Sequence, residues 1–270
     1  MGKAVSPVKT ANKAVPAAAA KTRLAAVPAL TARAFTAALL KIKSAKHRDS
    51  IQRFFKPGKE AGSEQDIFIG VKMGQLFAVA KTFAGMPVIE IEKLLESNIH
   101  EVRAGAVSIM DKASRSKKTT EARRKELFEL YMRRHDRINN WDLVDLGCLH
   151  MTGHYLLNKP HTLLYKMARS KNTWQRRTAM VTTCTFIRQG DTGDAFAIAE
   201  ILIQDKEDLI HKATGWMLRF AGDKEPKKLL EFLDKHAATM PRTTLRYSIE
   251  KLDKRKKDHY MGLKKKQAAI

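Results

Sequence analysis

The chain lacks several features that define common protein classes. Its 270 residues include only two cysteines, Cys148 and Cys184, which are far apart and give no disulfide framework. No run of about 18 apolar residues occurs, so no segment is a candidate membrane span. Glycine and proline are scarce, at 14 and 8 residues. These absences predict a largely helical globular protein of a reducing compartment, without a membrane partner.

Motifs that signal common cofactor and catalytic chemistries are also missing. The sequence has no Walker motif, no G-x-G-x-x-G, no H-E-x-x-H and no G-x-S-x-G. His150 and His154 have the spacing of a helical metal pair with Cys148 nearby, but no cluster of further ligands accompanies them. We interpret them as a structural pair and expect no metal and no small-molecule cofactor.

Acidic residues are missing from the N-terminal end. Residues 1–48 carry ten Lys and Arg and no acid, and residues 251–270 carry eight against two, within a net charge of +23. We expect a disordered basic Ala/Lys/Pro arm at 1–31, a folded domain at 32–250 and a basic C-terminal tail at 251–270. This charge predicts a polyanionic partner, nucleic acid before an anionic membrane surface. A solubility role for both ends and a cleaved transit peptide remain alternatives.

Helical periodicity runs from about residue 31 to 257, and no convincing strand pairs are found. Four similar segments begin at residues 101, 141, 174 and 209, each at the expected start of the inner helix of a helix pair. Their spacing predicts an all-α solenoid of HEAT-like repeats, in which equivalent helices share one concave face. Residues with the character of N-caps open several segments: Asn98, Asn140, Asn172 and Asp223.

Trp141 and Asp145 are four residues apart, so on a helix they project from the same face. Taken alone, the pair indicates a core tryptophan and a solvated surface aspartate. However, all three tryptophans of the chain, at 141, 174 and 216, fall within the predicted inner helices. Arg176, Arg177, Lys212 and Arg219 fall there as well, which favours a functional concave surface.

Several segments resemble the AlkD family of bacterial alkylpurine DNA glycosylases, which are HEAT-like solenoids. The matching pieces are residues 139–145 (NNWDLVD), 174–179 (WQRRTA) and 211–219 (HKATGWMLR). Residues 53–56, 68–71 and 240–247 resemble the family's opening and closing segments, so the resemblance covers about 33–250. It implies a catalytic set of Asp145, Trp141, Trp216 and Arg177. Arg176 is the competing position for the arginine, and Trp174 is expected to be core or to support Arg177.

The resemblance implies a monofunctional glycosylase of base excision repair that removes cationic N3- or N7-alkylated purines from double-stranded DNA. Such bases leave as neutral molecules, so a carboxylate that stabilises an oxocarbenium-like sugar and places a water suffices. Asp145 is the candidate for this role. The tryptophans would contact the lesion and the sugar through their electron-rich faces, and Arg177 would bind a phosphate. The family resemblance also implies that the base stays stacked.

A wider set of residues is expected to bind the DNA backbone: Lys56, Arg176, Lys212, Arg219, Arg242, Thr244 and Arg246. We further expect a monomer in a bacterial cytoplasm, associated with the nucleoid. Two other functions stay open. One is a non-catalytic solenoid that recognises altered or branched DNA, because some relatives of this fold have lost glycosylase activity. The other is a scaffold for proteins.

Overall fold

The computed structural model describes residues 29–55 and 66–267, and these residues form an all-α protein. Within these two ranges no strand occurs, and Ile67 and Ile99 form an isolated parallel bridge. The predicted arm lies almost entirely outside the described residues, as does Lys56. None of the helices in these ranges is both long and apolar enough to cross a membrane.

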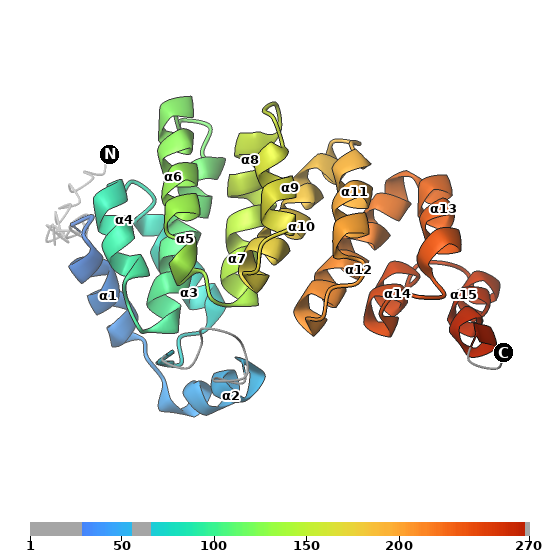
Figure 1. Ribbon diagram of the computed structural model, residues 1–270. Coiled ribbons are helices and arrows are strands. Elements are labelled where there is room, and N and C mark those ends of the chain that lie inside the picture. Colours follow the sequence, from blue (N-terminus) through green and yellow to red (C-terminus); the bar gives the residue numbers. More distant parts are fainter. Residues whose placement is uncertain (1–28, 56–65, 268–270) are drawn as a thin grey trace, which may run out of the picture.

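The helices stack as pairs into a curved solenoid with an inner and an outer row (Figure 1). The inner row consists of α3 (Met73–Thr82), α5 (His100–Arg115), α7 (Trp141–Gly147), α10 (Thr173–Arg188), α12 (Asp208–Lys224) and α14 (Arg242–Ser248). The outer row consists of α1 (Ala32–Lys41), α4 (Val88–Leu95), α6 (Glu121–Arg133), α9 (Thr162–Ala168), α11 (Gly193–Leu202) and α13 (Pro226–His236).

Five further elements complete the fold. Helix α2 (Ala45–Phe55) lies apart from the row, beneath the end formed by α1 and α3 in Figure 1. The short 3₁₀ helix η1 (His135–Arg137) precedes α7, and the π-helical turn η2 (Cys148–Thr152) joins α7 to α8 (Gly153–Leu156). Helix α15 (Lys254–Gln267) ends the described chain. The predicted solenoid of stacked helix pairs is thus confirmed.

The predicted starts of the four inner helices are correct to within one residue, because local signals set them. Asn140 accepts a hydrogen bond from the backbone N–H of Trp141 at 2.8 Å, and Asn172 accepts from Trp174 at 2.8 Å and Gln175 at 3.2 Å. These caps satisfy donors that a helix leaves free at its first turn. The other two expected caps are wrong: Ile99 precedes α5, and Asp223 lies inside α12.

One apolar core runs continuously along the stacked pairs. Helix α5 is buried over most of its length because α3, α4, α6 and α7 all pack against it. Small residues allow the closest approaches. A Cβ added to Gly147 of α7 would lie 2.5 Å from the ring of Tyr131 on α6, so only glycine fits between these two helices.

The basic C-terminal segment continues the fold instead of forming a free tail. Tyr260 of α15 is buried and donates its hydroxyl to Asp234 at 2.8 Å. Arg242 of α14 donates to the carbonyl of Met261 at 2.9 Å. The apolar positions that anchor α15 are few and are surrounded by lysines, which is why the helical pattern ends near residue 257 in the sequence.

Candidate functional site

The site forms where α7 begins, at the centre of the inner row. The Asn140 cap fixes Trp141 at the first position of α7, and Asp145 follows one turn later. The π-helical turn η2 follows α7 three residues after Asp145, and its Leu149 and His150 line the same cleft as Trp141 and Asp145. Single π turns of this kind are frequent at functional sites.

Asp145 is held by a bidentate ion pair with Arg177 of α10. Nη2 of Arg177 lies 3.0 Å from both carboxylate oxygens, and Nε lies 3.2 Å from Oδ1. Nη1 of Arg177 donates to the carbonyl of Leu209 in α12 at 2.7 Å. Burial raises the pKa of Asp145 above its ordinary value, although the charge and hydrogen bonds of Arg177 oppose the shift. The Arg177 guanidinium therefore links three successive inner helices, α7, α10 and α12.

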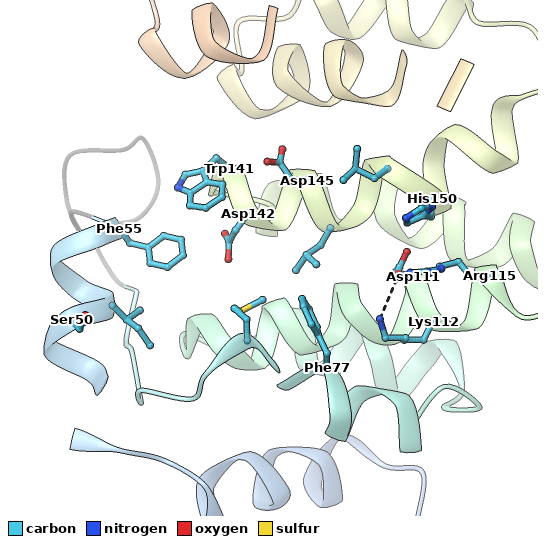
Figure 2. A pocket seen from close by; sticks show the side chains of 14 residues that line it. Ser50, Phe55, Phe77, Asp111, Lys112, Arg115, Trp141, Asp142, Asp145 and His150 are labelled. Atoms are coloured by element: carbon cyan, nitrogen blue, oxygen red, sulfur yellow. Dashed lines mark hydrogen bonds and ion pairs between the residues drawn. The ribbon is translucent and has the colours of Figure 1, made fainter. Parts of the chain in front are cut away.

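An open cleft of about 720 Å³ lies beside this carboxylate, between α2, α3, α5 and α7 (Figure 2). Its apolar walls are Ile51, Phe55, Met73, Phe77, Trp141, Leu146 and Leu149. Its polar lining residues are Ser50, Asp111, Lys112, Arg115, Asp142, Asp145 and His150. Concave, mostly apolar sites of this size with a few polar groups are typical of ligand binding.

Trp141 forms one wall of the cleft and is half-buried. Its indole stacks on Phe55 of α2, with ring centroids 5.4 Å apart and planes 15° apart. Phe55 in turn packs on Phe68 and His100, at centroid distances of 5.4 and 5.0 Å. The orientation of the indole is thus fixed by an aromatic cluster built from several elements.

Beneath this cluster lies a buried ionic network that the sequence did not reveal. Protonated His100 donates Nε2–H to Asp142 at 2.8 Å, and its Nδ1 lies 3.3 Å from Asp66. Arg103 donates to Asp66 at 2.7 Å and to Asn139 at 2.9 Å. Burial disfavours the charged imidazole, but the charge and hydrogen bond of Asp142 and the hydrogen bond of Asp66 outweigh it and raise the pKa of His100 to about 9. In the sequence, the only hint of this network was Asp142, an acidic residue next to Trp141.

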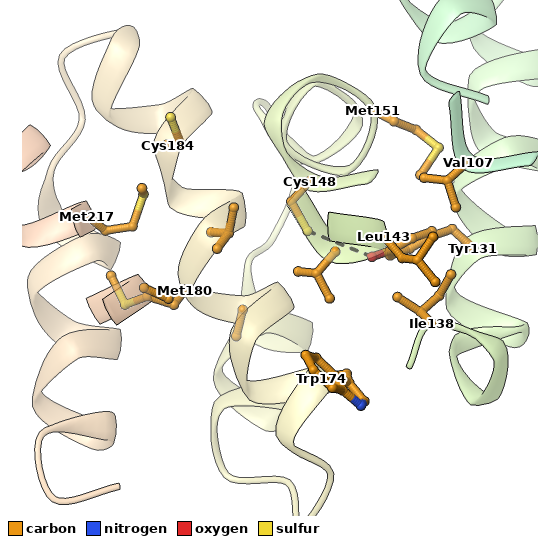
Figure 3. Close-up of a cluster of buried hydrophobic side chains, with 14 of the residues drawn as sticks. Val107, Tyr131, Ile138, Leu143, Cys148, Met151, Trp174, Met180, Cys184 and Met217 are labelled. Atoms are coloured by element: carbon orange, nitrogen blue, oxygen red, sulfur yellow. Dashed lines mark hydrogen bonds between the residues drawn. The ribbon is translucent and has the colours of Figure 1, made fainter. Parts of the chain in front are cut away.

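On the other side of α7 the side chains belong to the core. Figure 3 shows Trp174 among these buried residues, as expected, and the contact between Cys148 and the hydroxyl of Tyr131, 3.9 Å apart. Burial raises the pKa of Cys148 to about 12, so this thiol stays protonated. Across the described ranges, no group of three or more His, Cys, Asp or Glu residues has the geometry to hold a metal ion.

The structure brings Trp141, Asp145 and Arg177 together, but Trp216 is not among the residues that line the cleft. Trp216 is half-buried on α12, edge-to-face with Phe220 at 5.6 Å. The expected phosphate contact of Arg177 does not fit its environment, because the side chain is only 6% exposed and its donors are directed to Asp145 and Leu209.

The residues expected to bind phosphate have diverse environments. Arg176 is tied to Asp205 at 2.6 Å and donates to the carbonyls of Ser170 and Lys171. Lys212 is partly exposed and pairs with Asp208 one turn earlier, at 2.7 Å.

Four expected contacts lie toward the C-terminus of the solenoid. Arg219 is paired with Glu250, and Arg242 anchors α15. Arg246 is exposed. Thr244 is 1% exposed, so its expected DNA contact is wrong: α14 packs this residue against α12.

Comparison with known proteins agrees with this architecture. The sequence model of the family described as "DNA alkylation repair enzyme" matches residues 35–252. The fold is similar to that of a solved structure from Enterococcus faecalis, described as a predicted DNA alkylation repair enzyme. The TM-score is 0.60 and the identity 17%, over 78% of this chain and 97% of that one. A search of the curated proteins finds no match.

The chain therefore belongs to the DNA alkylation repair enzyme family. Membership implies a role in alkylation repair, with DNA as the substrate.

Proposed function

We propose that the protein is a monofunctional DNA glycosylase that hydrolyses the N-glycosidic bond of cationic N3- or N7-alkylated purines in double-stranded DNA. The observation that carries this proposal is the Asp145 carboxylate, held by Arg177 beside Trp141 at the edge of an open cleft. Its side chain keeps 20% exposure, so a substrate can reach it. Family membership supports the assignment.

The chemistry requires little beyond a well-placed negative charge. The bond between C1′ of the sugar and the ring nitrogen breaks, and its electron pair neutralises the cationic base. Water then adds its oxygen to C1′ and releases a proton to solvent. Asp145 stabilises the positive charge that develops on the sugar and orients the attacking water. Because the base leaves neutral, no strong general acid is needed.

Arg177 acts in this scheme as a positioning residue. Its bidentate contact fixes the rotamer of Asp145, and its charge favours the ionised carboxylate in a partly buried place. Trp141 offers an electron-rich face near the cationic nucleotide, a contact that contributes about 0.5–2 kcal/mol. We assign Trp216, on the neighbouring part of the inner row, a second contact of this kind.

DNA would lie along the inner row, with phosphates bound by exposed cations. Arg246 is exposed, and Lys212 is held only by a surface ion pair, which typically contributes about 0–1 kcal/mol and is readily exchanged for a phosphate. Arg176 is bound more firmly by Asp205, so its role would be to support the surface.

A base-release assay on methylated duplex DNA tests the function. Asp145→Asn should reduce release of 7-methylguanine by about 100-fold or more, the scale on which removal of one electrostatic transition-state interaction acts. DNA affinity should change little. Asp136→Asn, at an exposed position on η1, is the matched control and should retain full activity. Undiminished release by Asp145→Asn would refute the proposal. Binding without release from any alkylated DNA would instead favour the non-catalytic DNA-binding function.

A further inference from the structure

The last helix of the described chain lies beyond the part that the family model matches. The match ends at residue 252, whereas α15 begins at Lys254 and continues for 14 residues. Whatever this helix contributes to function is therefore an addition to the matched domain.

Helix α15 is more basic than the end of a solenoid requires. A terminal helix must present polar residues to solvent, and residues of both charges serve that need. The outer helices have such a mixture, since α6 carries four Lys or Arg and three Glu, and α13 carries three Lys and two acidic residues. Helix α15 carries seven Lys or Arg and a single acidic residue, Asp258. This one-sided charge favours the binding of a polyanion.

The fold holds this charge at the C-terminal end of the inner row. In Figure 1, α15 lies beside α14, whose Arg246 is exposed. Tyr260 of α15 donates to Asp234 of α13, and Arg242 of α14 donates to the carbonyl of Met261. Helix α15 is thus fastened to both preceding helices, and its cations lie next to the proposed path of the DNA.

The cations near the start of α15 are accessible to a ligand. Arg255 is exposed and has no ion pair with any residue that the structure describes. The side chain of Lys254 is 90% exposed and pairs with Asp258, one turn along the helix, at 2.6 Å. Surface pairs of this kind are weak and can be exchanged for a phosphate. Arg255 also borders an open hollow of about 400 Å³ between α13 and α15, together with Lys256 and His259.

We propose that α15 is an accessory DNA-binding element that contacts the phosphates of the duplex beyond the inner row. A duplex that lies along α12 and α14 and continues past the end of the matched domain meets α15 next. Contacts with phosphates add affinity without sequence preference. The inference rests on DNA as the substrate, which family membership implies, and does not depend on base release.

Fluorescence anisotropy of the full chain with an unmodified duplex of about 30 base pairs tests the proposal. Lys254→Gln/Arg255→Gln should reduce the slope of log K against log salt by about 0.9 for each lost phosphate contact, and so by up to about 1.8. Lys125→Gln/Lys166→Gln, on outer helices α6 and α9, is the matched control and should keep the wild-type slope. Lys125 pairs with Glu129 one turn along its helix, and Lys166 is exposed.

The position of the contact can be measured directly. The native cysteines, Cys148 and Cys184, are both buried, so the thiol introduced by Arg255→Cys is the exposed one. An iron–EDTA reagent attached to that thiol should cleave the backbone of the bound duplex. The same reagent attached through Lys166→Cys should not. Thermal unfolding of each variant verifies the fold.

The proposal would be overturned if Lys254→Gln/Arg255→Gln had the wild-type slope, or if the control lost as much. Absence of cleavage by the reagent attached through Arg255→Cys would overturn it as well. So would weaker binding of Lys254→Gln/Arg255→Gln to vesicles that contain phosphatidylserine together with an unchanged DNA slope, because α15 would then be a membrane-binding surface. Since the duplex is unmodified, failure of the glycosylase function shows in the base-release assay alone.

Discussion

At the scale of single residues, the proposed mechanism depends on a charged Asp145 carboxylate. Asp145 is partly buried, and burial alone would favour its protonated form. Arg177 supplies the compensating charge through two parallel contacts. The two neighbouring arginines on α10 have different partners, since Arg177 pairs with Asp145 and Arg176 pairs with Asp205.

Removal of Arg177 should therefore affect both activity and stability. Arg177→Gln leaves the Asp145 carboxylate without its partner, so the pKa of Asp145 should rise further. On acidification, the variant should therefore lose base release at a higher pH than the wild type. Stability should fall by about 3–5 kcal/mol, as when one partner of a buried ion pair is deleted. Urea unfolding and a pH profile of release measure the two effects.

The double variant Arg177→Gln/Asp145→Asn is the control for the stability effect. It removes both charges, so it should be more stable than Arg177→Gln alone. If Arg177→Gln did not change the pH profile of base release, this result would contradict the positioning role of Arg177.

At the scale of elements, the His100 network connects α5, the start of α7 and the segment before α3. Asp66, Arg103 and Asn139 join His100 and Asp142 in one buried cluster, and Phe55 packs over it against Trp141. The network balances two acids against two cations, so it depends on the protonation of His100. Alignment of α7 with its neighbours should accordingly depend on pH.

The sign of this dependence follows from the raised pKa. An unfolded His100 titrates near 6.5 and the folded one near 9, so its stabilisation is fully present below pH 6.5 and lost as pH rises through 9. The change corresponds to about 3 kcal/mol at most. Urea unfolding between pH 6 and 9.5 should show this loss in the wild type and not in His100→Gln. If the free energy of unfolding depended on pH in the same way in both proteins, the His100 network would not be the source of that dependence.

At the scale of the whole molecule, charge and shape act together. The net charge of +23 is concentrated at the two ends of the chain, and the structure fixes part of the C-terminal cluster in α15. An inner row of helices in a chain whose two terminal segments are rich in Lys and Arg suits a long polyanion better than a compact ligand.

Removal of residues 1–28, which contain five Lys and Arg, should lower the salt dependence of DNA binding. Each phosphate that is no longer neutralised by the arm should reduce the slope of log K against log salt by about 0.9. Fluorescence anisotropy at several salt concentrations gives this slope. Base release at low salt should persist, because the site lies elsewhere. Equal slopes for the full and shortened chains would rule out a DNA-binding role of the arm.

Local features of the sequence predicted the fold well. Helical periodicity and the caps Asn140 and Asn172 are encoded within a few residues, so the inner helices begin where expected. Interactions between residues far apart in the chain were harder to predict. The partners of Arg176 and Arg219 are 29 and 31 residues away, and cations that are engaged in the fold look free in the sequence. The burial of Thr244 and Tyr260 was not predicted because it depends on which face packs on the neighbouring helix.

The contact of Arg177 with Leu209 has a mechanical consequence. A solenoid bends by small changes in the offset between adjacent helix pairs. The guanidinium is fastened to α7 through Asp145, to α12 through the Leu209 carbonyl, and to α10 by its own backbone. Any flexing of these three pairs must displace or release the carboxylate. In the proposed mechanism, the curvature of the molecule and the reactivity of Asp145 are therefore coupled, and a duplex that fits the inner row would keep the Asp145 carboxylate in place to orient the attacking water.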